Sequence, residues 1–432
     1  MNKEVYDLLG VGIGPFNLGL AALLEPVSDI QAIFLEQKTQ FQWHPGLLME
    51  GTTIQVPFLA DLVTMANPCS RFSFLNYLRE QSRLYNFYFL ESFKIYRREY
   101  NHYCQWVAQE LESCQVGQRV EEIQWKKEGY FEVKSYNVST SETHIYYAKH
   151  LVLGVGSVPQ IPSCFNAVLP SENIFHSAEF LHKQSNYRKA KSVTVIGSGQ
   201  SAAEVFYKLL QEQKEYGYRL EWHTRSSGFF PMEYSKLGLE HFSPDYTRYF
   251  YSLSQEKRDE VRANQNLLYK GISFSLIGEI YDLLYERSIG ENCPNVRLLP
   301  LVEVKEVKAT ETGYRLGYRQ WQQDNYFSHE TDCIILATGY AHTIPKCLNG
   351  VQSLIKLDSQ NRYVVNFDYR LALTQNIPNS IFIQNGELHS HGIGAPDLGL
   401  GAHRNSVIIN TLMGREVYPV QRRNVFQEFG VA

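Results

Sequence analysis

The sequence predicts an α/β fold with two Rossmann-like dinucleotide-binding domains and a smaller, mostly helical insertion. Two glycine-rich turns carry this prediction, residues 10–17 (GVGIGPFN) and residues 197–204 (GSGQSAAE). Each turn follows a short apolar run typical of a buried strand and precedes a run typical of a helix. Such a turn lets the backbone approach a pyrophosphate, and the helix N-terminus supplies free N–H groups. Two of them in one chain indicate a pair of dinucleotides that exchange a hydride.

An acidic residue follows the first turn at the expected place. Residues 33–36 (IFLE) are typical of the second strand of a dinucleotide-binding unit, and Glu36 ends that strand. A carboxylate there binds the ribose hydroxyls of an adenosine. The third glycine position of the fingerprint holds Pro15 instead. An ordinary tight turn remains the alternative to a nucleotide site at both turns.

The second turn is followed by a basic residue. Residues 219–223 (RLEWH) are typical of the next strand, and Arg225 lies just beyond them. Arginine suits a 2′-phosphate, so the sequence favours NADPH over NADH at this site. The alternative is a solvated surface arginine.

Composition excludes several classes of protein. The 432 residues carry a net charge of −4 and are 44% apolar, which indicates sizeable cores and no nucleic-acid partner. No segment is long and apolar enough for an integral membrane span. The cysteines form no CxxC pair, which predicts reduced thiols in the cytoplasm and no metal site. They are Cys69, Cys104, Cys114, Cys164, Cys293, Cys333 and Cys347. His389 and His391 lack a third ligand nearby, so they do not predict a metal either.

The order of the segments predicts a discontinuous first domain. We expect residues 1–165 and 335–432 to form it, because the apolar runs at 150–153 and 333–336 each end in a turn. Residues 166–334 are expected to form the second domain. Within it, residues 229–290 have helical periodicity and are the predicted insertion.

Further motifs resemble one enzyme family. Ala337-Thr338-Gly339, together with the paired turns, resembles flavoproteins with two dinucleotide domains. Four segments resemble the N-hydroxylating flavin monooxygenases of siderophore biosynthesis: residues 41–46 (FQWHPG), 59–64 (LADLVT), 73–78 (SFLNYL) and 394–399 (GAPDLG). Residues 242–246 (FSPDY) and 268–273 (LYKGIS) resemble the branch of lysine and diamine N-hydroxylases. The resemblance covers nearly the whole chain.

The resemblance implies an FAD- and NADPH-dependent enzyme. NADPH reduces FAD, the reduced flavin and O₂ form a C4a-hydroperoxide, and a neutral primary amine takes the distal oxygen atom to become a hydroxylamine. NADP⁺ stays bound through the cycle. The cofactor supplies the chemistry, so no catalytic triad is expected.

The resemblance also assigns residues to sites. The FAD pyrophosphate and ribose are expected at Gly12, Gly14, Pro15, Phe16, Asn17, Glu36 and Gln37. The flavin is expected again at Thr338, Gly339, Asp397 and Leu398, and NADPH at Gly197, Ser198, Gly199, Gln200, Ser201 and Arg225. Trp43, His44 and Gln55 are the expected catalytic residues near the flavin ring or the nicotinamide. Their alternatives are core packing for Trp43, a satisfied loop histidine for His44 and a solvated side chain for Gln55.

One departure from the family concerns the substrate. Members specific for amino acids have a lysine at the position of Ala60, and that lysine pairs with the substrate α-carboxylate. Alanine there implies a decarboxylated amine such as putrescine, cadaverine or histamine. A substitute cation, Lys270 or Arg248, would leave L-lysine or L-ornithine as the alternative.

Other residues are expected around the amine. The resemblance places Tyr246 in the substrate site. The far ammonium of a diamine calls for a carboxylate, and Asp61, Asp245 and Glu240 are candidates, with exposed surface acids as the alternative.

Two other functions are compatible with the paired glycine turns. A Baeyer–Villiger or heteroatom monooxygenase shares both turns, but residues 175–180 (FHSAEF) only partly resemble its motif. A catalytically silent flavoprotein is the other. The expected partners are the amine, O₂ and further copies of the chain in a dimer or tetramer.

Overall fold

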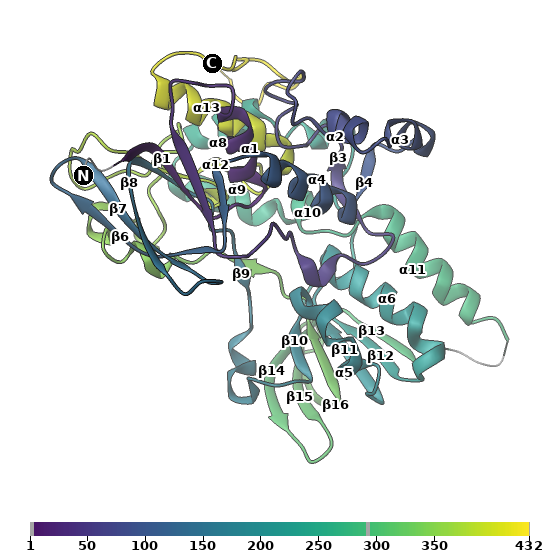
Figure 1. The fold of residues 1–432 in the computed structure, drawn as a ribbon. Helices are drawn as coiled ribbons and strands as arrows, with labels where there is room; N and C mark the ends of the chain where they lie inside the picture. The colour runs from purple at the N-terminus through teal and green to yellow at the C-terminus, as the bar shows by residue number, and fades with distance from the viewer. Residues whose placement is uncertain (1–3, 291–293, 432) are drawn as a thin grey trace.

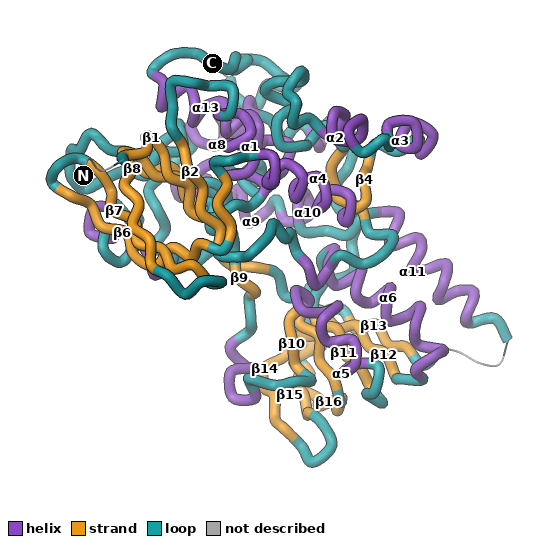
Figure 2. The backbone as a smooth tube through the Cα atoms, in the orientation of Figure 1, coloured by secondary structure: helices purple, strands orange, loops and turns teal. Residues whose placement is uncertain are grey.

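The computed structural model describes residues 4–290 and 294–431, so Cys293 lies outside the described residues. The chain forms two α/β units that are joined by two crossing segments (Figure 1). Figure 2 shows most of the strands in two separate groups, one in each unit. The predicted fold class is confirmed.

The first domain is built on a parallel sheet in the order β5-β2-β1-β8, and β19 continues it beside β8. The bounds are Val5–Val11 (β1), Ala32–Glu36 (β2), Cys114–Val116 (β5), Thr143–Leu153 (β8) and Ile381–Ile383 (β19). An antiparallel ribbon of β6 (Gln118–Lys126) and β7 (Tyr130–Asn137) extends the first half of β8.

Alternating side chains of these strands build two hydrophobic cores. Leu8 packs with α1 (Pro15–Leu24), α4 (Arg97–Glu110) and α13 (Gly401–Met413). Its neighbour Leu9 points to the other face, against residues 347–373. That segment holds η4 (Lys346–Leu348) and η5 (Gln352–Leu354).

Shorter elements lie between β2 and α4 and near the end of the chain. The first group is η1 (Pro45–Leu47), β3 (Thr53–Pro57), α2 (Phe74–Glu80), α3 (Leu84–Leu90) and β4 (Lys94–Tyr96). The second group is α12 (Leu388–His391) and η6 (Leu398–Leu400).

The second domain is built on a parallel sheet in the order β10-β17-β11-β12-β13. The bounds are Ile174–His176 (β10), Ser192–Ile196 (β11), Arg219–His223 (β12), Val296–Leu299 (β13) and Cys333–Leu336 (β17). α6 (Gln200–Tyr216) packs against this sheet through Val205, Phe206 and Leu209. Beside the sheet lie β14 (Val302–Ala309), β15 (Tyr314–Gln320) and β16 (Asn325–Thr331), and before β11 lie η2 (Ser163–Val168), η3 (Ser177–Lys183) and α5 (Gln184–Tyr187).

The chain crosses between the domains at two paired strands. β9 (Val158–Pro159) runs antiparallel to β18 (Tyr340–Ala341). Phe165 packs in a core of the second domain with Leu316 and Leu336, and β17 pairs with the second sheet along its length. The expected boundaries at 165 and 335 therefore cut into the second domain, and we place the crossings at residues 158–160 and 338–341.

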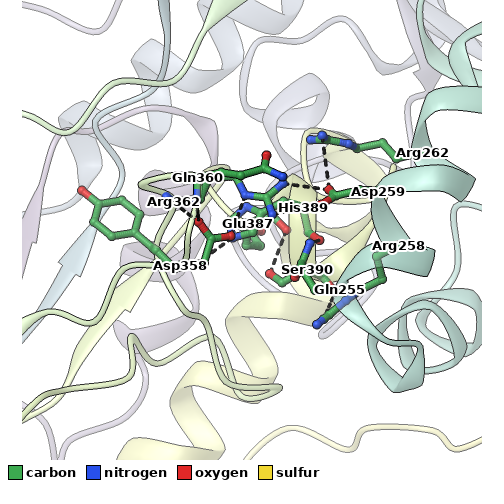
Figure 3. Close-up of polar contacts among 11 residues, drawn as sticks. Gln255, Arg258, Asp259, Arg262, Asp358, Gln360, Arg362, Glu387, His389 and Ser390 are labelled. Atoms are coloured by element: carbon green, nitrogen blue, oxygen red, sulfur yellow. Dashed lines mark hydrogen bonds and ion pairs between the residues drawn. The ribbon is translucent and has the colours of Figure 1, made fainter.

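The helices of the insertion contact both domains. They are α7 (Lys236–Leu239), α8 (Pro244–Ser252), α9 (Gln255–Asn264), α10 (Asn266–Tyr269) and α11 (Phe274–Arg287). α8 and α9 pack against α12 of the first domain, whereas α11 packs against α6 of the second. Figure 3 shows the α9 contact, in which Arg362 forms ion pairs with Asp259 of α9 and with Asp358. In the part of the chain that the structure describes, no helix has the length and apolar character to cross a membrane.

Candidate active site at the junction of the two domains

Backbone and side chains of the first domain pack closely against the first glycine turn. Gly12 has a φ of +87°, and a Cβ there would lie 2.6 Å from the carbonyl oxygen of Gly154. The Asn17 side chain is fully buried and donates to Gly12 O at 2.8 Å, while its Oδ1 accepts from Gln384 at 2.9 Å. Gly14 precedes α1, and Pro15 is its first residue. The side chain of Asn17 therefore supports the turn, and the helix N-terminus is the part that we expect to face a pyrophosphate.

Glu36 is fixed by the same turn. Its carboxylate accepts the backbone N–H of Ile13 at 2.8 Å and that of Lys38 at 3.0 Å. Glu36 is half-buried, and Gln37 beside it is exposed. The acid thus lies directly beside the glycine turn, as a ribose ligand requires.

Residues 397–401 lie against the first turn, although they are far away in the sequence. The Asp397 carboxylate accepts the N–H of Gly399 at 2.7 Å, and burial raises the pKa of Asp397 to about 6. A Cβ on Gly401 would lie 3.1 Å from the Phe16 ring, and Asn405 donates to Phe16 O. One small cavity joins both segments and is lined by Pro15, Phe16, Asp61, Leu62, Tyr100, Leu398, Gly401 and Asn405. The structure therefore brings the expected FAD residues of both segments together.

The second glycine turn is also built for close approach. Gly197 has a φ of +144°, and a Cβ there would lie 2.1 Å from Ala337 O. Trp222 donates its indole N–H to Gly197 O at 2.8 Å. Gly199 precedes α6, so Gln200 and Ser201 lie in the first turn of that helix. The free N–H groups of this helix end are suited to a second pyrophosphate.

Arg225 lies at the carboxyl end of β12, next to the second turn. The Ser198 hydroxyl is 2.8 Å from that of Ser226. Arg225 is exposed, and within residues 4–290 and 294–431 no hydrogen bond or ion pair engages its guanidinium. It is therefore available for an external phosphate.

Thr338 and Gly339 lie at the crossing rather than against the first turn. Gly339 O accepts the His176 Nε2–H at 3.0 Å and the N–H of Gln160 at 2.9 Å. The Thr338 hydroxyl donates to Gln160 O. Their direct neighbours thus belong to the second domain and to the crossing, and contact with the flavin stays a prediction for both residues.

His44 and Trp43 form an aromatic cluster at the junction. His44 has a φ of +49°, and its ring lies edge-on to Trp43 at 5.1 Å and to Tyr340 at 5.5 Å between centroids. Burial and the nearby charges of Arg97 and Lys38 lower the pKa of His44 to about 4. A neutral imidazole therefore lies where the first domain meets the crossing.

Gln55 joins the first domain to the start of the insertion. Its side-chain Nε2 is 3.9 Å from the sulfur of Met232, and its backbone carbonyl oxygen accepts a hydrogen bond from the Tyr234 hydroxyl at 3.0 Å. Burial and the charge of Asp397 raise the pKa of Tyr234 to about 12. Gln55 is thus half-buried beside groups from the insertion, which is different from the solvated alternative.

The carboxylates expected around the amine are already engaged. The Asp61 carboxylate accepts four hydrogen bonds, from the N–H groups of Val63, Thr64 and Phe74 and from the Thr64 hydroxyl. Burial raises its pKa. We therefore correct the expectation for Asp61, whose carboxylate organises its own loop.

Asp245 and Glu240 hold the C-terminal segment. Asp245 accepts two hydrogen bonds from Asn424, and Glu240 accepts the N–H groups of Phe426 and Gln427. The structure gives Asp245 a partner other than substrate.

The remaining substrate candidates differ in environment. Ala60 is buried, and a Cβ on Gly399 would lie 3.8 Å from the Cβ of Ala60. The buried Tyr246 hydroxyl accepts from Gln265. Lys270 is exposed over the Tyr269 ring. Arg248 donates to Arg422 O on the surface. Ala60 thus lies beside Gly399, which directly follows the expected flavin contacts Asp397 and Leu398.

His389 and His391 are both engaged by backbone. His389 Nε2 bonds Tyr363 O at 2.7 Å, and His391 Nε2 bonds Phe367 O at 3.2 Å. Both side chains therefore fix α12 to the neighbouring backbone, and Figure 3 shows His389 there.

Sequence reasoning missed several residues at the junction. Tyr340 directly follows the Ala-Thr-Gly motif and could have been found from that position. Arg97 lies in no motif, and Glu204 ends the second glycine-rich segment without any sign of a partner 107 residues away, although the two form an ion pair between the domains.

Comparisons with known proteins agree with this geometry. The chain matches the L-lysine 6-monooxygenase/L-ornithine 5-monooxygenase family over residues 4–342. It is 46% identical to the rhizobactin siderophore biosynthesis protein RhbE of Rhizobium meliloti, over 99% of this chain and 95% of that protein. It is 42% identical to the putrescine N-hydroxylase of Shewanella oneidensis, over 99% of this chain and 85% of that protein.

A solved structure is also similar over the full chain. The FAD-bound cadaverine monooxygenase DfoA of desferrioxamine biosynthesis in Erwinia amylovora has a TM-score of 0.95 and 41% identity. The match covers 100% of this chain and 99% of that structure. The chain therefore belongs to the L-lysine 6-monooxygenase/L-ornithine 5-monooxygenase family.

Proposed function

We propose that this flavin-dependent N-monooxygenase hydroxylates one primary amine of an aliphatic diamine, putrescine or cadaverine, for siderophore biosynthesis. The observation that carries the proposal is the buried Ala60 beside Gly399, at the position where the family resemblance implies a lysine in the amino-acid-specific members. Without that cation, an α-carboxylate would lose its ion-pair partner during desolvation. The similarity to a putrescine N-hydroxylase and a cadaverine monooxygenase supports the same substrate class.

The two glycine turns fit FAD and NADPH. Gly12, Gly14 and Glu36 would hold the FAD pyrophosphate and ribose, because the turn has no Cβ in the way and the carboxylate lies beside it. Gly197, Gly199 and Arg225 would hold NADPH. Once bound and reduced, FAD supplies activated oxygen for the amine. We propose that NADP⁺ stays bound through the cycle.

Residues of the chain itself would shield and orient the reacting groups. Trp43, His44 and Tyr340 pack edge to face and would close the junction against water. His44 stays neutral near pH 7 because its pKa is about 4, so it adds no charge that repels an ammonium. Gln55 and Tyr234 are the polar groups that we expect to face the nicotinamide or the amine.

A substrate panel tests the proposal. Hydroxylamine formation would be measured with NADPH and with putrescine, cadaverine, histamine, L-ornithine and L-lysine. We expect kcat/KM for one aliphatic diamine to exceed that for either amino acid by at least about tenfold, the value of one lost ion pair. Preferred turnover of L-lysine or L-ornithine would overturn the substrate assignment and leave the cofactor assignment standing.

One observation favours the amino-acid alternative. Lys94, on the strand that pairs with β3, lies 5.0 Å from the centre of the Tyr234 ring. Tyr234 in turn donates to Gln55 O, so a cation is present near the expected amine site. If Lys94 binds a carboxylate, replacing Lys94 by Met would lower amino-acid turnover. If Lys94 does not bind a carboxylate, the replacement would leave diamine turnover unchanged.

We also propose that the enzyme is a homo-oligomer that works in the cytoplasm. Tyr85, Tyr88 and Phe89 of α3 are 70–77% exposed, and Phe93 is 69% exposed. Side chains of this size bury roughly 150–250 Å² each, so the patch approaches the ~800 Å² per partner of a stable interface. A second copy is the proposed occupant because these four aromatic side chains carry no charge and can pair with the same side chains of another copy. Light scattering would show a monomer for a Tyr88→Lys/Phe89→Lys variant, and an unchanged oligomer would overturn this interface.

A further inference from the structure

An ion pair links the two domains beside the second glycine turn. Arg97 is the first residue of α4 in the first domain, and Glu204 lies in α6 of the second (Figure 1). Arg97 donates from Nη1 to Glu204 Oε2 and from Nη2 to Glu204 Oε1, both at 2.8 Å. The side chains are only 10% and 3% exposed. A buried two-pronged pair fixes direction as well as distance, which an exposed pair does not.

The pair is linked to the candidate active site on both sides. Arg97 Nη1 also donates to Leu47 O at 3.0 Å, three residues after His44. Glu204 Oε1 accepts a hydrogen bond at 2.9 Å from the side-chain amide of Gln200, the first residue of α6. Gln200 Oε1 then accepts the N–H of Ser273 at 2.8 Å, just before α11. One chain of hydrogen bonds therefore runs from the His44 loop to the NADPH-side helix and on to the insertion.

Packing around the pair is tight. A Cβ on Gly46 would lie 1.9 Å from Ala178 O of the second domain. Leu47 and Met49 are buried in the hydrophobic core of the second domain, with Phe180 and Phe206. The loop of the first domain is thus inserted into the second domain, and Arg97 holds its carbonyl group at the point of entry.

We propose that Arg97 and Glu204 are positioning residues that keep the helix of the second glycine turn aligned with the His44 loop. This inference rests on the proposed function. In coupled turnover, NADPH, H⁺, O₂ and the amine give NADP⁺, water and the hydroxylamine. In uncoupled turnover, NADPH, H⁺ and O₂ give NADP⁺ and H₂O₂. Alignment sets the balance, because a loosened helix admits water and moves the dinucleotide away from its partner.

The chain offers a matched control on the same helix. Glu212 of α6 pairs with Arg188 at 2.8 Å, and both residues belong to the second domain. Arg97→Gln, Glu204→Gln and the double variant would be compared with Arg188→Gln. The measurements are hydroxylamine and H₂O₂ formed per NADPH, the KM for NADPH, NADP⁺ affinity by fluorescence quenching, and hydrogen–deuterium exchange of residues 44–49 and 200–204.

We expect each inter-domain variant to lower product per NADPH by about threefold or more, with H₂O₂ rising to match. We expect KM for NADPH and the NADP⁺ dissociation constant to rise by about fivefold, and exchange to increase in both segments. The double variant should be no worse than the poorer single variant, because removing one partner leaves the other charge buried and unpaired. Arg188→Gln should leave all of these values within about twofold.

Two results would overturn the proposal. One is coupling, NADP⁺ affinity and exchange close to those of the unmodified enzyme in Arg97→Gln and Glu204→Gln. The other is an equal effect of Arg188→Gln. If Arg97→Gln loses FAD or fails to fold, the same measurements on Arg97→Lys test the proposal. Lysine keeps the positive charge and loses the two-pronged guanidinium contact. If the unmodified enzyme hydroxylates no amine, the proposed function fails, while NADP⁺ affinity and exchange still test the positioning role.

Discussion

Glu36 accepts the backbone N–H of Ile13 at 2.8 Å, so the acid that ends β2 is bound to the glycine turn that ends β1. The two residues are 23 positions apart, and the parallel pairing of β1 and β2 brings them together. The carboxylate therefore both stabilises the turn and faces the place where an adenosine ribose is expected.

Replacing Glu36 by Ala is predicted to weaken FAD binding. The change removes an acceptor for Ile13 N–H and a charged ligand for the ribose hydroxyls, which together contribute about 2–3 kcal/mol. The FAD dissociation constant should rise by roughly 30–100-fold in a fluorescence titration of the apoenzyme. Glu112→Gln, at an exposed site before β5, is the control. An unchanged FAD affinity in Glu36→Ala would remove the ribose role.

Replacing Arg225 by Ala is predicted to affect NADPH far more than NADH. The exposed guanidinium would pair with the 2′-phosphate, which NADH lacks. We expect KM for NADPH to rise by about 10–100-fold and KM for NADH to change less than about twofold. Steady-state kinetics with both dinucleotides measure this, with Arg315→Ala of the same domain as the control. Equal effects on both dinucleotides would contradict the assignment.

The turns could be predicted from sequence because their chemistry is local. A position such as Gly12, with a φ of +87° and a carbonyl 2.6 Å from its missing Cβ, must be glycine, and the strand and helix runs flank it directly. Glu36 follows from the fixed spacing of a βαβ unit. The fold class follows from the same two units.

The rest depends on contacts that sequence spacing does not reveal. The Thr338–Gly339 turn ends a buried strand, but the pattern does not say which sheet that strand joins, and β17 joins the second. The sequence makes Asp61 a candidate because the far ammonium of a diamine calls for a carboxylate, whereas in the structure backbone N–H groups surround this carboxylate. The Arg97–Glu204 pair combines two surface-type residues into a buried contact, which only the docking of two domains creates.

Replacing Asp61 by Asn is predicted to destabilise the first domain without a specific loss of amine affinity. Asparagine can accept through one atom only, and its NH₂ group would face the N–H of Phe74 or the Thr64 hydroxyl. We expect a loss of about 2–3 kcal/mol in the free energy of unfolding. Thermal unfolding measures this, and KM for the diamine in the folded enzyme should stay within about twofold. A large rise in KM with unchanged stability would restore a substrate role for Asp61.

His44 is predicted to make stability depend on pH. Its pKa is about 4 in the folded protein and near 6.5 in an exposed imidazole, because burial and the charges of Arg97 and Lys38 oppose protonation. Between these values the unfolded chain binds the extra proton, so stability is fully present above pH 6.5 and is lost as pH falls toward 4. His44→Phe keeps an aromatic ring beside Trp43 and Tyr340 and cannot titrate.

The test is the difference in melting temperature between about pH 7 and about pH 5. We expect the unmodified protein to lose more stability over this interval than His44→Phe, by on the order of 2 kcal/mol. His144→Phe, at a partly exposed site on β8, is the control and should follow the unmodified protein. Parallel curves for the unmodified protein and His44→Phe would show that His44 is not the titrating group.

Replacing Ala60 by Lys is predicted to shift the enzyme away from diamines. The new ammonium would lie beside Gly399, in the buried part of the site, where it repels the far ammonium of putrescine or cadaverine and attracts an α-carboxylate. Ala60→Met adds a side chain of similar length without charge, and it separates crowding from electrostatics. We expect kcat/KM for the diamine to fall by at least about tenfold more in Ala60→Lys than in Ala60→Met. KM for L-lysine or L-ornithine should fall only in Ala60→Lys. If both variants lose diamine turnover equally and neither gains amino-acid affinity, residue 60 acts through volume alone, and the choice between diamine and amino acid is made by other groups such as Lys94.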